Sequence, residues 1–153
     1  MPVEIREASD SDVSDLAALR WQWHAERHDP VGSGFADFER GFARWWAEKG
    51  TRFRVVLASD GSEVVGMGFL ALVNRVPGPD DLDRHHGDIQ SMYVARQHRG
   101  MGLGSELLRA LLGLATDTGC NRVEVHSGRR AVAFYERAGF EHFPQLMNHH
   151  LDG

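Results

Sequence analysis

The sequence predicts an α/β domain in which strands and helices alternate along one chain. Runs of alternating apolar and polar residues indicate strands, and apolar residues at helical spacing indicate helices. A third observation is a strand-like run that passes through a glycine-rich turn into a leucine-rich helix. The 153 residues are enough to bury a full core, so we expect one domain over 1–153.

In the first half of the chain the pattern predicts a strand, two helices and a hairpin. Ser9 or Asp10 can accept hydrogen bonds from the next turn, so the first helix should begin there. A break at 29–34 with proline and glycine separates the helices, and Gly50 ends the second. The polar turn at 59–62 separates two β-rich runs, which is typical of a hairpin. We expect strands at 3–8, 53–58 and 64–73, and helices at about 9–27 and 36–49.

The second half begins with a polar loop, which is longer than a simple turn and therefore suggests a functional segment. A strand and a long helix then flank the glycine turn, and a further strand and a short helix follow. Two last strands would close the sheet. The expected order is a loop at 77–87, a strand at 89–94, a helix to about 118, a strand at 122–126, a helix at 130–137, and strands from Phe140 and at 146–151.

The glycine turn is the feature with the clearest chemical meaning. Gly100, Gly102 and Gly104 lack Cβ, so the turn can adopt positive φ angles and let a ligand approach the backbone. The helix after it leaves N–H groups free at the positive end of its dipole, which suits a phosphate or pyrophosphate. Ser105 occupies the third glycine position of a Rossmann fingerprint, and no Gly-Lys-Ser/Thr of a Walker A loop is present.

Composition excludes several other functions. The net charge of −5 argues against a general nucleic-acid binder, and no run is long enough to span a membrane. A single cysteine, Cys120, and the lack of an apolar signal segment predict a cytoplasmic protein. The nine histidines include two adjacent pairs but no metal-binding spacing, so we expect no metal site.

Two motifs resemble those of the GNAT superfamily of N-acetyltransferases. Arg99-Gly100-Met101-Gly102-Leu103-Gly104 fits the turn R/Q-x-x-G-x-G/A, and residues 131–140 (AVAFYERAGF) resemble the second hallmark of the family. The resemblance implies a mixed, mostly antiparallel sheet of six to seven strands that four helices flank. It also implies that the sheet is splayed between the fourth and fifth strands.

The resemblance implies acetyl-CoA as the cosubstrate. Backbone groups of Met92 and Val94, with Tyr93 between them, would bind the pantetheine as an added strand. Tyr135 would lie near the thioester sulfur and protonate the departing thiolate. Gly128 stands where the family often has an asparagine, so that contact is not carried over. The amides that would hold the pyrophosphate are those of Arg99, Gly100, Met101, Gly102, Leu103, Gly104 and Ser105.

The attacking amine needs to lose a proton. Exposing the lone pair of a lysine-like ammonium at pH 7 costs about 4–5 kcal/mol. The candidate bases are Asp88, Glu124 and His126, and the sequence does not favour one of them over the others. Strand alternation places Asp88, Gln90 and Met92 on one face, where Gln90 could position a water. The resemblance assigns the acceptor to the first two helices and the 77–87 loop, with the candidates Trp21, Trp23, His24, His28, Gly34 and Phe35.

The resulting hypothesis is an N-acetyltransferase in which a primary amine attacks acetyl-CoA directly in a ternary complex. A small-molecule acceptor is favoured over a protein N-terminus or lysine side chain. The alternatives are a CoA-binding sensor without turnover and an enzyme that transfers a longer acyl group. Within this family a homodimer is also an accepted arrangement, but the sequence does not locate an interface.

Overall fold

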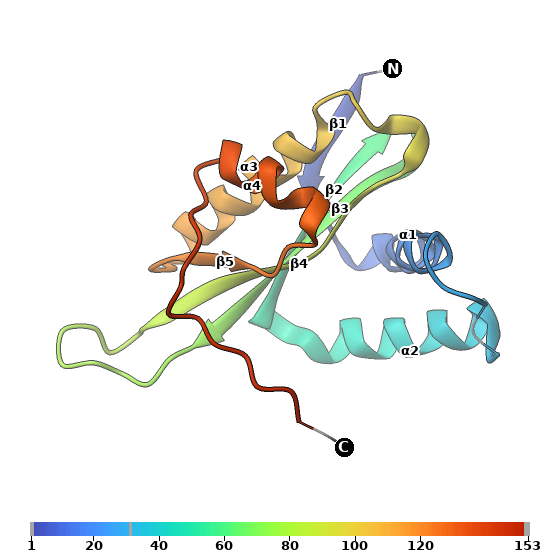
Figure 1. Ribbon diagram of the computed structural model, residues 1–153. Helices are drawn as coiled ribbons and strands as arrows, with labels where there is room; N and C mark the ends of the chain where they lie inside the picture. The colour runs from blue at the N-terminus through green and yellow to red at the C-terminus, as the bar shows by residue number, and fades with distance from the viewer. Residues whose placement is uncertain (1, 31, 152–153) are drawn as a thin grey trace.

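The computed structural model describes residues 2–30 and 32–151, so Val31 in the predicted break lies outside the described residues. Five strands form one sheet in the order β1-β2-β3-β4-β5 (Figure 1). All neighbouring strands are antiparallel except β4 and β5, which are parallel. The strands are β1 (Val3–Glu7), β2 (Phe53–Asp60), β3 (Glu63–Asn74), β4 (His85–Val94) and β5 (Val123–Val125).

Four helices cover the sheet, two on each face (Figure 1). The N-terminal helices lie on one face, and the two helices that follow the glycine turn and β5 lie on the other. The predicted mixed sheet with four flanking helices is therefore confirmed. The helices are α1 (Val13–Ala25), α2 (Gly34–Lys49), α3 (Leu103–Asp117) and α4 (Val132–Arg137), and a 3₁₀ turn at Asp10–Asp12 precedes α1.

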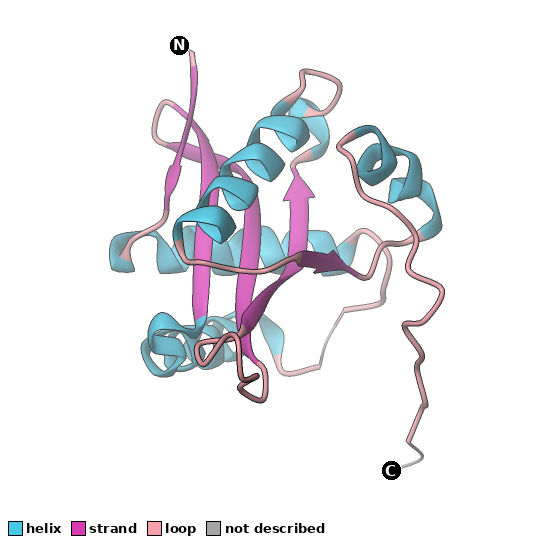
Figure 2. Cartoon of the chain, turned by 90° about the vertical axis from the view of Figure 1, so that its left-hand side faces the viewer, coloured by secondary structure: helices cyan, strands magenta, loops and turns pink. Residues whose placement is uncertain are grey.

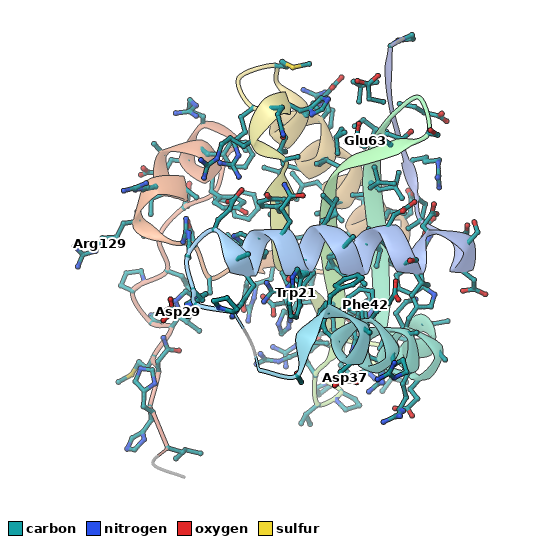
Figure 3. All side chains as sticks on the ribbon, turned by 90° about the vertical axis from the view of Figure 1, so that its right-hand side faces the viewer. Trp21, Asp29, Asp37, Phe42, Glu63 and Arg129 are labelled. Atoms are coloured by element: carbon teal, nitrogen blue, oxygen red, sulfur yellow. The ribbon has the colours of Figure 1, made fainter. Side chains whose placement is uncertain are left out.

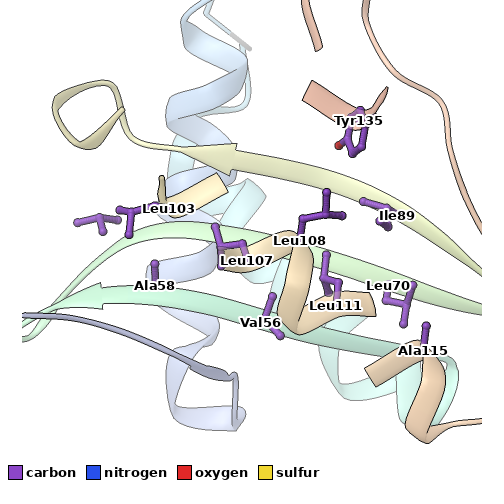
Figure 4. Packing of buried hydrophobic residues seen from close by; sticks show 11 residues of the cluster. Val56, Ala58, Leu70, Ile89, Leu103, Leu107, Leu108, Leu111, Ala115 and Tyr135 are labelled. Carbon is purple, nitrogen blue, oxygen red and sulfur yellow. The ribbon is translucent and has the colours of Figure 1, made fainter. Parts of the chain in front are cut away.

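Two apolar cores sandwich the sheet. On one face, the leucines predicted from helical spacing bring α3 onto β2, β3 and β4, and Leu107 and Leu111 are fully buried (Figure 4). On the other face, Leu16 and Leu19 of α1 pack with Trp46, Phe69 and Tyr93. Burial of this apolar surface from both sides holds the sheet in place, and with it the strand β4 that carries the candidate site.

The start of α1 is fixed by a buried carboxylate. Asp12 accepts two hydrogen bonds from Arg6 of β1, at 2.8 and 2.9 Å, and one from the backbone N–H of Ser9 at 2.8 Å. The hydrogen bonds from Arg6 are the main reason that the pKa of Asp12 falls to about 2. Trp46 of α2 donates to Asp10 at 2.8 Å, which ties the second helix to the same turn.

Strand β4 begins four residues earlier than predicted, so the preceding loop is shorter than the expected 77–87. Its register against β3 shifts between Met67 and Phe69, and Ser91 has a positive φ of 54°. This β-bulge changes the alternation of side chains along the strand. Met92 consequently packs against the α3 core, and the prediction that it shares a face with Asp88 and Gln90 is wrong.

The sheet opens between β4 and β5, as predicted. The two strands pair only at Gly87–Ile89 against Val123–Val125, and β4 then continues to Val94 without a partner on that side. Figure 2 shows β5 turning away from β4 beyond this short ladder. The unpaired length of β4 forms the wall of the cleft described below.

The predicted sixth and seventh strands do not form. Residues 140–151 are irregular, with one turn in which Leu146 N–H donates to the carbonyl of Phe143 at 3.0 Å. A strand needs a neighbouring strand to satisfy its backbone groups, and the segment after the turn leads away from the sheet (Figures 1 and 2). The sheet therefore has five strands rather than six or seven.

Candidate active site

A cleft of about 860 Å³ lies where β4 and β5 separate. One wall is β4 from Asp88 to Val94, and the opposite wall is the end of β5 with residues 126–131. Tyr135 of α4 also lines the cleft, as do Trp23, Glu26 and Arg27 at the end of α1. The cleft thus combines an open strand edge, a buried phenol and the end of the first helix.

Glycine residues shape the turn at one end of this strand. Gly100 and Gly102 have φ angles of 79° and 82°, in the left-handed region that favours glycine, and a Cβ at either would meet no atom within 4 Å. Gly102 caps α3, whose first turn leaves its N–H groups without helical partners. No described residue accepts a hydrogen bond from the amides of Gly100, Met101 or Gly102. The turn therefore presents free amides on the surface, as an anion site requires.

The two sequence motifs meet in space. The ring of Phe134 lies 3.5 Å from the position that a Cβ on Gly104 would occupy, so α4 packs close to the first turn of α3. This contact fixes α4, and Tyr135 with it, relative to the glycine turn. Among the residues predicted to hold the pyrophosphate, Arg99 lines the cleft, whereas residues 100–105, which form the turn and the start of α3, are not part of its lining.

Tyr135 is held by packing rather than by hydrogen bonds. Its side chain is 6% exposed, and its ring contacts Phe134 and Phe140 edge to face at centroid distances of 5.0 and 5.4 Å. Figure 4 shows it above β4, next to Ile89. Burial raises the pKa of the Tyr135 phenol above its ordinary value, so the residue stays protonated at neutral pH.

Glu26 is a cleft residue that the sequence did not reveal. Arg99 donates to its two oxygens at 3.1 and 3.3 Å, and the hydroxyl of Tyr93 donates to it at 2.7 Å. Burial alone raises the pKa of Glu26, but these hydrogen bonds outweigh burial, so the pKa lies below its ordinary value. Glu26 is thus an ionised residue that links α1 to β4 and to the glycine turn. Only a fold brings residues 26 and 99 together, so no local motif signals the pair.

Aromatic stacking and hydrogen bonds hold the side chain of Tyr93 in place. Trp23 stacks on its ring at 5.7 Å, and Gln22 donates to its hydroxyl at 3.1 Å. Arg99 further donates through Nε to the carbonyl of Val94 at 2.8 Å, so this acceptor at the end of β4 is already engaged. On the side that faces β5, the described ladder ends at Ile89, so the backbone of β4 near Met92 has no described strand partner there.

The three candidate bases lie in different places. Asp88 and His126 line the cleft, and Gln90 donates to Asp88 at 2.9 Å. Glu124 lies instead beside a second groove, where it accepts a hydrogen bond from Arg122 at 2.8 Å and faces His86 at 3.6 Å. The geometry therefore favours Asp88 and His126 as groups that can reach a bound amine.

Of the aromatic residues predicted to bind the acceptor, some line the cleft and others lie outside it. Trp23 lines the cleft, whereas Trp21 packs between α1 and α2, 5.6 Å from Phe35 and 5.7 Å from Phe38. Figure 3 shows Trp21 and Phe42 in this layer between the two helices. His24 and His28 stack on each other at 4.4 Å, outside the cleft lining. Of the aromatic residues predicted for the acceptor, Trp23 is therefore the one that lines the cleft.

Two negative findings concern the described residues. Within 2–30 and 32–151 there is no group of three or more His, Cys, Asp or Glu side chains that could hold a metal ion. No helix in those ranges is long and apolar enough to cross a bilayer.

The family model for the acetyltransferase (GNAT) family matches residues 15–140. The chain therefore belongs to the GNAT family of acetyl-CoA-dependent acyltransferases.

Curated relatives match part of the chain. Glucosamine 6-phosphate N-acetyltransferase of Trypanosoma brucei brucei is 35% identical over 61 residues, which are 40% of this chain and 42% of the relative. N-alpha-acetyltransferase MAK3 of Arabidopsis thaliana is 30% identical over 77 residues, which are 48% of this chain and 40% of the relative. The chain thus spans less than half the length of the curated relatives it matches.

Solved structures extend the likeness over the whole fold. A predicted acetyltransferase of Clostridium acetobutylicum, solved with acetyl-CoA, has a TM-score of 0.78 at 18% identity, and the match covers 97% of this chain and 96% of that chain. An integron cassette protein of V. cholerae has a TM-score of 0.82 at 17% identity, with 100% and 94% covered. At these identities the likeness concerns the fold.

Proposed function

We propose that the chain transfers the acetyl group of acetyl-CoA to a primary amine by direct attack in a ternary complex. The observation that carries the proposal is the cleft itself. The lining of this space of about 860 Å³ includes β4 from Asp88 to Val94, Arg99 before the glycine turn, and Tyr135, which supports the proposal. The proposal includes no covalent acyl-enzyme, and Cys120 lies outside the cleft lining.

The glycine turn and the β4 edge would hold the cosubstrate. The diphosphate would accept hydrogen bonds from amides of residues 99–105, of which those of Gly100, Met101 and Gly102 have no acceptor among the described residues, at the positive end of the α3 dipole. The pantetheine amides would then pair with the backbone near Met92, in the manner of an added strand. The carbonyl of Val94 already accepts from Arg99, so pairing there would use the rest of the edge.

Tyr135 would stabilise the leaving thiolate as a hydrogen-bond donor. A thiol with a pKa of about 8.5 is a stronger acid than a phenol with a pKa of about 10, so full proton transfer is uphill by about 2 kcal/mol. Burial raises the pKa of Tyr135 further and increases this difference. The residue therefore stays protonated while its hydroxyl stabilises the developing negative charge.

Deprotonation of the amine would fall to Asp88 or His126, directly or through a water that Gln90 orients. Asp88 and Gln90 are already joined by a hydrogen bond at 2.9 Å. The carboxylate of Glu26 is already engaged, because Arg99 and Tyr93 donate hydrogen bonds to it. The base must offset the about 4–5 kcal/mol that neutral amine formation costs at pH 7.

We favour a small-molecule acceptor in the cytoplasm. Arg27 and Trp23 flank the cleft from α1, so an acceptor with an anionic or aromatic group beside its amine would find complementary chemistry there. The names of the relatives point to both a sugar phosphate and protein N-termini. A single cysteine, which is a free thiol, agrees with a reducing compartment.

The test is an acceptor screen with the full chain. Purified protein is incubated with acetyl-CoA and a panel of amino sugars, amino acids, polyamines and N-terminal peptides. Free CoA is measured by thiol reaction, and the acetylated product is measured by mass spectrometry. We expect one small amine to give stoichiometric product. CoA binding without transfer to any member would instead support a sensor module, and peptide acetylation alone would identify a protein acceptor.

A further inference from the structure

The guanidinium of Arg99 is held from three sides. Its Nε donates to the carbonyl of Val94 at 2.8 Å, and its Nη2 donates to the two carboxylate oxygens of Glu26 at 3.1 and 3.3 Å. The group also lies over the ring of Tyr93, with Cζ 5.4 Å from the ring centroid. No described residue accepts a hydrogen bond from Nη1 of Arg99, so this nitrogen keeps its N–H donors for a ligand.

Glu26, which holds this guanidinium, is itself fixed in place. Its side chain is 17% exposed, and the hydroxyl of Tyr93 donates to it at 2.7 Å. Gln22, one turn earlier in α1, donates to the same hydroxyl at 3.1 Å. Because Glu26, Tyr93 and Arg99 all line the cleft, the end of α1, the end of β4 and the residue before the glycine turn meet at one wall.

The stability of α1 does not explain a glutamate at this position. Glu26 is the C-cap residue of α1, where the negative end of the helix dipole disfavours a carboxylate. Partial burial of the charge adds a further cost. The hydrogen bonds from Arg99 and Tyr93 offset both effects, so the reason for this carboxylate lies in its partners and not in its own helix.

We propose that Glu26 is a positioning residue for the cosubstrate: it fixes the guanidinium of Arg99 so that Nη1 donates to a phosphate oxygen of coenzyme A. An arginine side chain has large rotamer freedom, and a group that is ordered before binding loses less of this freedom on binding. Arg99 directly precedes the turn whose amides have no described acceptor, so the fixed guanidinium adds a side-chain donor to that set. The inference rests on the proposed function, since it requires coenzyme A to bind at this turn.

A purely electrostatic role for Glu26 predicts an effect of the opposite sign. A carboxylate near the diphosphate repels it, so removing that charge would tighten the binding of coenzyme A. Loss of a positioning contact weakens the binding instead, because Arg99 must then be ordered when the ligand binds. The sign of the change in affinity therefore distinguishes the two roles.

Titration calorimetry of the full chain with coenzyme A and with pantetheine tests the proposal. Glu26→Gln should weaken the binding of coenzyme A about 2- to 12-fold, the cost of ordering one long side chain. The affinity for pantetheine, which lacks the diphosphate, should stay at the wild-type value and so show that the cleft is intact. Glu48→Gln is the matched control, because it makes the same change on an exposed carboxylate outside the cleft lining and should behave as the wild type. Unchanged or tighter binding of coenzyme A in Glu26→Gln would overturn the proposal.

A second variant shows whether Glu26 acts through Arg99. Arg99→Met removes the guanidinium and should weaken the binding of coenzyme A roughly 10- to 150-fold, as expected for a hydrogen bond to a charged group. Adding Glu26→Gln to this variant should cause no further loss. A further loss would overturn the proposal, since Glu26 would then act independently of Arg99. Failure of the wild type to bind coenzyme A would contradict the proposed function as well, whereas an effect missing only in Glu26→Gln would contradict this inference alone.

Discussion

Replacing Tyr135 by phenylalanine separates the chemical role of the hydroxyl from the structural role of the ring. The ring contacts with Phe134 and Phe140 remain in the variant, and the hydroxyl makes no hydrogen bond to a described residue. Thermal stability should therefore change little. A hydrogen bond to a charged group contributes about 1.5–3 kcal/mol, so loss of the bond to the thiolate should lower kcat roughly 10- to 150-fold.

The assay is steady-state release of CoA with the acceptor found in the screen, together with thermal unfolding of both proteins. Tyr93→Phe is the contrasting control, because the Tyr93 hydroxyl donates to the half-buried Glu26 at 2.7 Å. That variant should lose about 1–3 kcal/mol of stability by leaving Glu26 short of a donor. An unchanged kcat in Tyr135→Phe, with wild-type stability, would refute the role of the phenol.

Two further predictions concern the backbone of the turn and the buried carboxylate. Gly102→Ala forces a residue with Cβ to a φ of 82°, so it should lower the free energy of unfolding in urea by about 1–2 kcal/mol. Gly113→Ala, in the exposed middle of α3, should instead raise it by about 0.5–1 kcal/mol. Equal effects of the two substitutions would contradict the assigned backbone strain. Asp12→Asn removes a carboxylate whose pKa is lowered from 3.8 to about 2, so it should cost about 2 kcal/mol at pH 7. The stabilisation is complete above the pKa of Asp12 in the unfolded chain and is lost as the pH falls through its pKa in the folded protein. The difference in free energy of unfolding between wild type and Asp12→Asn should therefore shrink between about pH 4 and pH 2. A difference that does not depend on pH would exclude ionisation of Asp12 as its cause.

The parts of the fold that sequence reasoning found are those that local rules determine. Leucine spacing located α3, and the glycines of the turn carried the positive φ angles that their lack of Cβ allows. Gly50 and Gly139, expected at helix ends, also have positive φ angles. These features depend on residues a few positions apart, so the chain alone is sufficient to predict them.

The errors arose where a distant partner decides the structure. The bulge at Ser91 involves no glycine and depends on the register between β3 and β4. The segment 146–151, expected as a strand, has no strand partner among the described residues, so it is irregular. Glu26 joined the site only because α1 ends beside Arg99. Local pattern predicts which residues can form an element, and tertiary pairing decides whether they do.

The central claim is that backbone amides of residues 99–105 bind the diphosphate of coenzyme A. Titration calorimetry of the full chain with coenzyme A and with pantetheine, which lacks the diphosphate, tests this claim most directly. We predict clear binding of coenzyme A, at least hundredfold weaker binding of pantetheine, and a loss of affinity for coenzyme A in Gly102→Ala but not in Gly113→Ala. Equal affinity for the two ligands, or none for coenzyme A, would contradict the account.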